Sequence, residues 1–131
     1  PAKYLSSINE AVSQVDVVFL AVPGGAATKH LINEAVFCSM QKHAILVNIA
    51  RGDVISEKAL IEALQTGQIG GAGLDVYEFE PEVPEALMKM ENVTLFPHLG
   101  TASLEVRTQM GELALKNIEE FIGNQTPTNL L

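Results

Sequence analysis

Short apolar runs alternate with stretches of helical periodicity along most of the chain. Four runs are rich in apolar and β-branched residues, as in strands buried on both faces, and they predict strands at Val17–Val22, Ala44–Ile49, Gly71–Val76 and Val93–Phe96. The segments around them predict helices at Ser7–Val15, Leu31–Ser39, Ser56–Gln65 and Glu85–Met90. Ser56 is expected to cap the third of these helices, with Gly67 just beyond its end.

A longer amphipathic helix is expected after the last strand. One face of it carries Val106, Met110, Leu113, Ala114, Asn117 and Phe121. Apolar strands separated by helices of about ten residues are typical of parallel βαβ units, with helices on both faces of the sheet. The pattern therefore predicts an α/β fold.

Residues that could bind a substrate or transfer a proton lie at the ends of the predicted strands. Ligands bind beyond the carboxyl ends of the strands in such sheets, where this sequence has Arg51, Asp75, Glu80 and His98. The planar fork of an arginine can hold a carboxylate through two hydrogen bonds. A histidine can give or take a proton near neutral pH, and a neighbouring glutamate would stabilise its charged form. Together these groups could bind and protonate a 2-oxo acid.

Each of these residues also has a purely structural interpretation, which position alone leaves open. Arg51 can bridge surface carboxylates, and Asp75 can cap a turn. Glu80 can belong to a solvated acidic loop with Glu78, Glu82 and Glu85, and His98 can be structural in its turn. The two other histidines, His30 and His43, are interpreted as structural.

Composition narrows the classes of function. The chain has 131 residues, of which 47% are hydrophobic, so it can form one domain or part of one. A net charge of −8, with scattered basic residues, argues against a nucleic-acid partner. The longest apolar run is too short for a membrane span, so no membrane partner is expected. The single cysteine, Cys38, fits a reducing compartment such as the cytoplasm, and its apolar neighbours suggest a structural thiol.

Several common site motifs do not occur in the sequence. Gly71 and Gly73 begin a G-x-G-x-x-G pattern, but its third glycine is replaced by Val76. No cysteine and histidine cluster has the spacing of metal ligands, so no metal is expected.

Two segments resemble a known family. "VNIARGDVISEKALIEALQTGQIGGAGLDVYEFEP" and "NVTLFPHLGTAS" closely resemble the C-terminal half of the D-isomer-specific 2-hydroxy acid dehydrogenases, which include glyoxylate and hydroxypyruvate reductases and phosphoglycerate dehydrogenase. The resemblance extends from Asp16 to about Ile122 and includes the spacing of Arg51, Asp75 and Glu80. It implies the second half of a Rossmann-type NAD(P)-binding domain over residues 1–104. Residues 105–131 would then be an interdomain helix and tail that belong to a substrate domain upstream.

The resemblance also implies roles for the residues at the strand exits. Arg51 would anchor the substrate carboxylate, His98 would be the general acid or base, and Glu80 would pair with His98. Asp75 would hydrogen-bond the nicotinamide carboxamide. The bound NAD or NADP would contact Val22, Pro23, Thr28, Ile49, Ala50, Arg51, Asp75, His98 and Gly100. Gly52 is expected to give the turn after Arg51 its conformational freedom.

The implied activity is hydride transfer between NAD(P)H and a small 2-oxo acid or D-2-hydroxy acid, in a homodimer formed through the nucleotide domain. Formate dehydrogenases share the architecture, but a glutamine stands there in place of Glu80. The alternative is a non-catalytic NAD(H)-sensing module like the corepressor relatives. The family's glycine-rich loop and most of its substrate domain lie upstream of this sequence. The chain alone is therefore expected to be inactive and, with apolar sheet faces uncovered, to associate.

Overall fold

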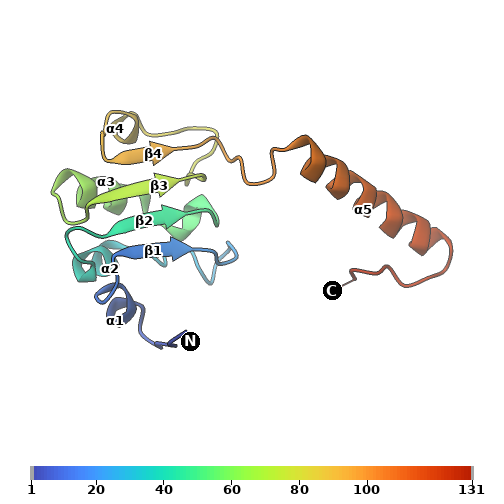
Figure 1. The fold of residues 1–131 in the computed structure, drawn as a ribbon, viewed down its shortest axis with the longest axis horizontal. Helices are drawn as coiled ribbons and strands as arrows, with labels where there is room; N and C mark the ends of the chain where they lie inside the picture. Colours follow the sequence, from blue (N-terminus) through green and yellow to red (C-terminus); the bar gives the residue numbers. More distant parts are fainter. Residues whose placement is uncertain (1, 131) are drawn as a thin grey trace. The chain divides into compact units, whose positions relative to one another are not determined.

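The larger of two compact units is built around a parallel sheet. The computed structural model describes residues 2–130. The described residues up to Pro97 form one compact unit and those from His98 onward form another. In the first unit, four parallel strands lie in sequence order (Figure 1): β1 (Val17–Leu20), β2 (Ile45–Asn48), β3 (Gly71–Leu74) and β4 (Val93–Leu95).

The helices of this unit follow the predicted alternation. They are α1 (Ile8–Val12), α2 (Glu34–Ser39), α3 (Glu57–Gln65) and α4 (Glu85–Met88), with a short 3₁₀ helix η1 (Gly52–Val54) that the sequence did not predict. The predicted elements are present, and the differences are confined to their ends. Helix α2, for example, begins three residues later than predicted, because the side chain of Asn33 caps it by accepting from the N–H groups of Ala35 and Val36.

The sheet has one buried face and one exposed face. Parallel register aligns Val18 with Leu46 and Ala72, and these side chains face the core. The alternate positions face the other way, and there Val17, Phe19 and Ile45 are about half exposed. The prediction that the strands are covered on both faces is therefore wrong for this unit.

The strand order explains the one-sided packing. Each connection leads to the next strand in the same direction across the sheet. Parallel crossovers are almost always right-handed, so consecutive steps in one direction place all connecting helices on the same face. Helix α3 lies behind the strands in Figure 1 and buries Leu60, Ala63 and Leu64. Cys38 on α2, which was interpreted as a structural thiol, is exposed.

The second unit contains the predicted long helix. Helix α5 (Leu104–Ile122) is capped by Ser103, whose Oγ accepts a hydrogen bond from the Val106 N–H at 3.3 Å. The division into residues 1–104 and 105–131 stays a prediction, and its end points, residues 1 and 131, lie outside the described residues. Within residues 2–130, no helix is both long enough and apolar enough to cross a membrane.

Candidate active site

Arg51 follows β2 on a turn that a buried asparagine holds in place. Asn48 is completely buried; its Nδ2 donates to the Arg51 carbonyl at 3.0 Å, and its Oδ1 accepts from the Ala50 N–H at 2.9 Å. The Arg51 side chain is exposed, and its guanidinium donates to the Ala50 carbonyl at 2.7 Å. A Cβ on Gly24 would lie 2.7 Å from the Arg51 Cγ, so Gly24 leaves room for the arginine stem. The turn thus presents a cation at the exit of a central strand.

Position 52 requires a glycine, but for a different reason from the one expected. Its φ angle is not in the left-handed region, and what requires glycine is the approach of the loop after β3. A Cβ at Gly52 would lie 1.8 Å from the Tyr77 carbonyl oxygen. Backbone from the β3 exit therefore rests directly on the residue after Arg51.

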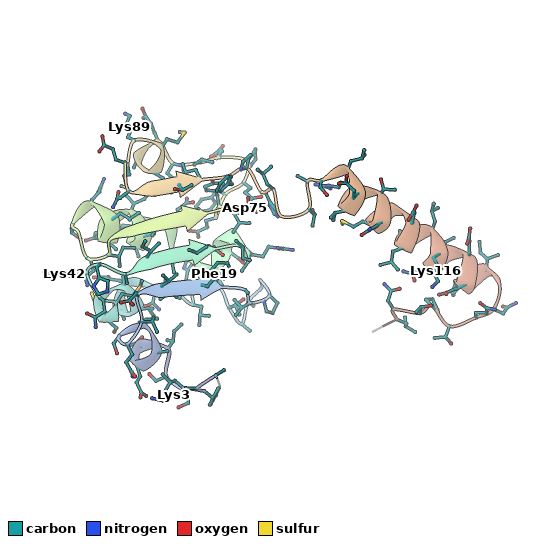
Figure 2. The ribbon with its side chains drawn as sticks, in the orientation of Figure 1. Lys3, Phe19, Lys42, Asp75, Lys89 and Lys116 are labelled. Atoms are coloured by element: carbon teal, nitrogen blue, oxygen red, sulfur yellow. The ribbon has the colours of Figure 1, made fainter. Side chains whose placement is uncertain are left out.

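The loop after β3 carries Asp75 and Glu80. The Asp75 N–H donates to the Asn48 carbonyl at 3.0 Å, so the first of these residues begins beside the buried asparagine of β2. Asp75 lies at the same end of the sheet to which the strand arrows point (Figure 2). One carboxylate oxygen of Glu80 accepts from the Tyr77 N–H at 3.0 Å. The structure thus brings the Arg51 turn and the Asp75–Glu80 loop together at one edge.

Tyr77 extends this arrangement to the exit of β4. Its hydroxyl donates to the Phe96 carbonyl at 2.8 Å, and the Leu74 carbonyl lies at 3.4 Å. Burial, followed by the negative charge of Asp75, raises the pKa of the Tyr77 phenol, so the hydroxyl keeps its proton and remains a donor. Sequence reasoning missed Tyr77, although an aromatic residue between two acidic ones was visible.

His98 is the first residue of the second unit and has a φ of 55°, a left-handed conformation that is uncommon for a residue other than glycine. It is exposed, as are its neighbours Leu99 and Gly100. Its pairing with Glu80 stays a prediction.

The residues expected to line a cofactor lie at the exits of β1 and β2. After β1, the hydroxyl of Thr28 donates to the Pro23 carbonyl at 2.7 Å, which closes the loop, and Val22 is half-buried. After β2, Ile49 is 51% exposed while Ala50 is buried. An exposed isoleucine beside a strand exit fits contact with a flat ring, so these residues are compatible with a nicotinamide cofactor. Among residues 2–130, no group of three or more acidic, histidine or cysteine side chains could hold a metal ion.

A second set of polar residues lies near the candidate site, and the sequence had not predicted that they contribute to it. Glu57 at the start of α3, Glu78 in the β3 exit loop and His30 in the β1 exit loop are joined by hydrogen bonds. In the sequence, Glu78 was grouped with a solvated acidic loop and His30 was interpreted as structural. Neither residue gave a signal, because their contacts link segments far apart in sequence.

Comparison with known proteins identifies the family. The sequence pattern of the D-isomer specific 2-hydroxyacid dehydrogenase NAD binding domain matches residues 2–100. The chain therefore belongs to the D-isomer specific 2-hydroxyacid dehydrogenases and has the Rossmann-type fold of their NAD-binding domain.

Two relatives illustrate the similarity in sequence. The chain is 47% identical over 124 residues to a glyoxylate reductase of Pyrococcus horikoshii, covering 95% of this chain and 37% of the relative. It is 43% identical over 116 residues to a hydroxyphenylpyruvate reductase of Plectranthus scutellarioides, covering 88% of this chain and 37% of that protein. The chain thus spans less than half the length of these relatives.

Two solved structures illustrate the similarity in fold. The NADPH-dependent glyoxylate/hydroxypyruvate reductase of Sinorhizobium meliloti, in complex with NADP and malonate, matches with a TM-score of 0.87 and 38% identity, covering 93% of this chain and 40% of that one. The holo D-mandelate dehydrogenase of Rhodotorula graminis matches with a TM-score of 0.90 and 40% identity, covering 97% and 38%.

Proposed function

We propose that the protein containing this chain transfers a hydride between NAD(P)H and a small 2-oxo acid, as a glyoxylate or hydroxypyruvate reductase does. The observation that carries the proposal is the Arg51 turn, because Asn48 and Gly52 fix an exposed cation against the Asp75–Glu80 loop. Similarity to several glyoxylate reductases supports the same activity.

In this proposal, Arg51 binds the substrate carboxylate through two charge-assisted hydrogen bonds and sets the orientation of the 2-oxo group. The nicotinamide cofactor, when bound, supplies the hydride that reduces the carbonyl carbon. Negative charge then develops on the carbonyl oxygen, where His98 delivers a proton and Arg51 stabilises the charge. Glu80 is assigned to pair with His98 and to orient its imidazole for the transfer.

The cofactor-facing residues have a separate task. Asp75 is assigned to the carboxamide of NAD or NADP, and Val22, Pro23, Thr28, Ile49, Ala50 and Gly100 to the adjacent surface. The exposure of Ile49 supports this assignment. We further assign residues 1–104 to the nucleotide domain and 105–131 to the substrate domain, in a cytoplasmic homodimer. The single cysteine supports that location.

The test is reduction of glyoxylate and hydroxypyruvate by the full-length protein with NADH or NADPH. His98→Ala should lower kcat by about 10²- to 10⁴-fold, the usual contribution of proton transfer, while cofactor affinity changes little. His43→Ala is the matched control, because His43 is exposed and pairs with Asp16 at 2.6 Å at the other end of the strands. Cofactor binding without turnover in the parent protein would instead favour a non-catalytic NAD(H)-sensing module.

A further inference from the structure

Three strand exits are joined behind the candidate site. The β1 exit loop forms a short parallel ladder with the segment after Arg51, through a bridge between Ile32 and Ile55. The His30 N–H donates to the Asp53 carbonyl at 2.8 Å, and the Ile32 N–H to the Val54 carbonyl at 3.0 Å. The first two exits are therefore held together by backbone hydrogen bonds.

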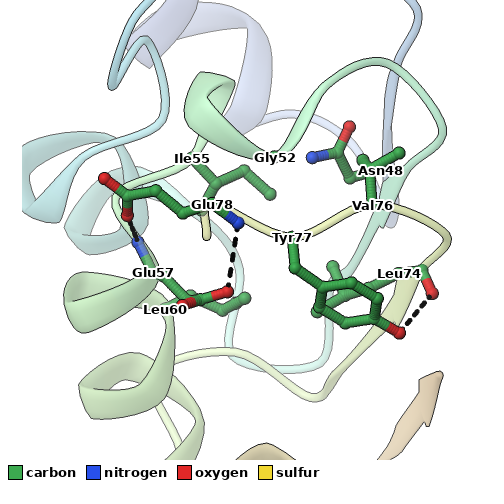
Figure 3. Close-up of a pocket in the computed structure, with 9 residues that line it drawn as sticks. All are labelled: Asn48, Gly52, Ile55, Glu57, Leu60, Leu74, Val76, Tyr77 and Glu78. Carbon is green, nitrogen blue, oxygen red and sulfur yellow. Dashed lines mark hydrogen bonds between the residues drawn. The ribbon is translucent and has the colours of Figure 1, made fainter. Parts of the chain in front are cut away.

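The third exit is attached by a reciprocal pair of glutamates (Figure 3). The Glu57 N–H donates to Oε2 of Glu78 at 3.1 Å, and the Glu78 N–H donates to Oε1 of Glu57 at 3.3 Å. Glu57 is the first residue of α3, and the side chain of Ser56 makes no capping hydrogen bond. The Glu78 carboxylate therefore caps α3 in place of Ser56, which had been expected to do so, and its charge is favoured at the helix N-terminus.

The same carboxylate also reaches the first exit. Oε1 of Glu78 lies 2.7 Å from Nε2 of His30, and the Glu78 side chain is 12% exposed whereas that of His30 is 40% exposed. Burial by itself would raise the pKa of Glu78, but the hydrogen bonds from His30 and from the Glu57 N–H outweigh it, and the pKa is lowered. Glu78 is thus an ionised group with one partner in the β1 exit loop and another at the start of α3.

We propose that Glu78 is a positioning residue for the reaction, and that the group His30, Glu57 and Glu78, here termed the exit clamp, holds the Asp75–Glu80 loop on the Arg51 turn. The inference rests on the proposed function, since it concerns the groups assigned to that reaction. Glu78 lies two residues before Glu80, and the Tyr77 carbonyl beside it touches Gly52. A shift of Glu78 would therefore move both the arginine and the acidic side chains.

Four variants of the full-length enzyme test this assignment. Glu78→Ala removes the carboxylate, whereas Glu78→Gln keeps a carbonyl oxygen for the Glu57 N–H and an amide that can donate to neutral His30. Glu57→Ala breaks the clamp from its other side. Glu82→Ala is the matched control, because Glu82 is exposed in the same acidic loop.

The readouts are kcat and KM for glyoxylate at 25 °C, with folding verified by circular dichroism, together with hydrogen exchange of the Glu57 and Asp75 amides, which donate to Glu78 and to the Asn48 carbonyl. Glu78→Ala should lower kcat/KM at least about tenfold, as misplacement of catalytic groups does, and should speed exchange at both amides. Glu78→Gln should remain within about threefold of the parent, which corresponds to less than about 1 kcal/mol. Glu57→Ala should also lower kcat/KM, as Glu78→Ala does.

Two results would overturn the assignment. If Glu78→Ala accelerates exchange but leaves kcat/KM equal to that of Glu82→Ala, the clamp serves stability alone. If exchange is also unchanged, the clamp does not hold the loop. A parent enzyme that binds NAD(P)H but reduces no 2-oxo acid would refute the proposed function, and the clamp is then judged by exchange alone: acceleration in Glu78→Ala supports it, and no change refutes it.

Discussion

Helices α3 and α5 have the same kind of amphipathic sequence in different surroundings. Helix α3 has nine residues and buries four of them, including Glu57 at its start. None of the 19 residues of α5, Leu104–Ile122, is buried, although this helix carries Met110, Leu113 and Phe121. Apolar periodicity thus predicts where a helix forms, but it does not identify the surface that will cover it.

The two faces of the sheet repeat the same contrast on a smaller scale. Leu46 is completely buried, whereas Phe19, which faces the other way, is 58% exposed. Both are apolar residues in continuous apolar strands. The sequence therefore predicts burial of both faces. Within residues 2–97, only the face that carries the connecting helices is buried.

The largest effect is expected when a methyl group is added at Gly52 in the first unit, and the same change at Gly111 in α5 provides the comparison. At Gly52 the new Cβ would meet the Tyr77 carbonyl at 1.8 Å, whereas at Gly111 in α5 nothing lies within 4 Å. Gly52→Ala should lower the free energy of unfolding of the 131-residue chain by about 3 kcal/mol, an overpacking cost. Gly111→Ala should instead favour the helix by about 0.5–1 kcal/mol. Thermal melts followed by circular dichroism measure both, and similar melting temperatures for the two variants would contradict the contrast.

Asn48→Leu should have the next largest effect. The substitution keeps the branched shape of the side chain but leaves the Arg51 carbonyl and the Ala50 N–H without their side-chain partner. A cost of about 2–3 kcal/mol in urea denaturation follows from such unmet groups. Ile45→Leu, at an exposed position of the same strand, is the control and should change stability by less than about 0.5 kcal/mol. Equal costs would mean that the asparagine does not hold the turn.

A moderate effect is expected from the exposed face of the sheet. The isolated chain should associate, because Val17, Phe19, Ile45 and Ile49 expose apolar surface together. Phe19→Lys should shift the sedimentation profile toward the 14.1 kDa monomer with little change in stability. Association that is unaffected by this variant would place the contact elsewhere.

The smallest effect concerns pH. The pKa of Glu78 is lowered from its ordinary value of 4.5, so its contribution to stability is complete above pH 4.5 and is lost as the pH falls through the folded-state pKa. Burial raises the pKa of Glu57, so the stability linked to Glu57 is present below pH 4.5 and is lost as the pH rises through its folded-state pKa. Glu78→Gln should therefore weaken the loss of stability on acidification below pH 4.5, as measured by urea titrations at several pH values. An unchanged or steeper slope would contradict this account.

Particular residues show how much of the fold and of the candidate site could be predicted from the sequence. The order of elements and the exit positions of Arg51 and Asp75 followed from periodicity, because parallel βαβ units place strand exits at one edge. The reason for Gly52 was wrong, since close approach of another loop cannot be read from local sequence. Glu78 was hidden among neighbouring acids, and its role depends on His30, 48 residues away. Local patterns predict elements, while long-range polar contacts require the fold.

The most direct measurement compares two substrates of the full-length protein that differ only in the group assigned to Arg51. Glyoxylate carries a carboxylate beside its aldehyde, and glycolaldehyde carries a hydroxymethyl group in its place. In Arg51→Gln, kcat/KM for glyoxylate should fall at least about 100-fold, since two charge-assisted hydrogen bonds are lost, whereas kcat/KM for glycolaldehyde should fall much less, since only the charge stabilisation at the carbonyl oxygen is lost. An equal fall for both substrates, or no fall for either, would contradict the claim that the β2 exit is built to hold a carboxylate.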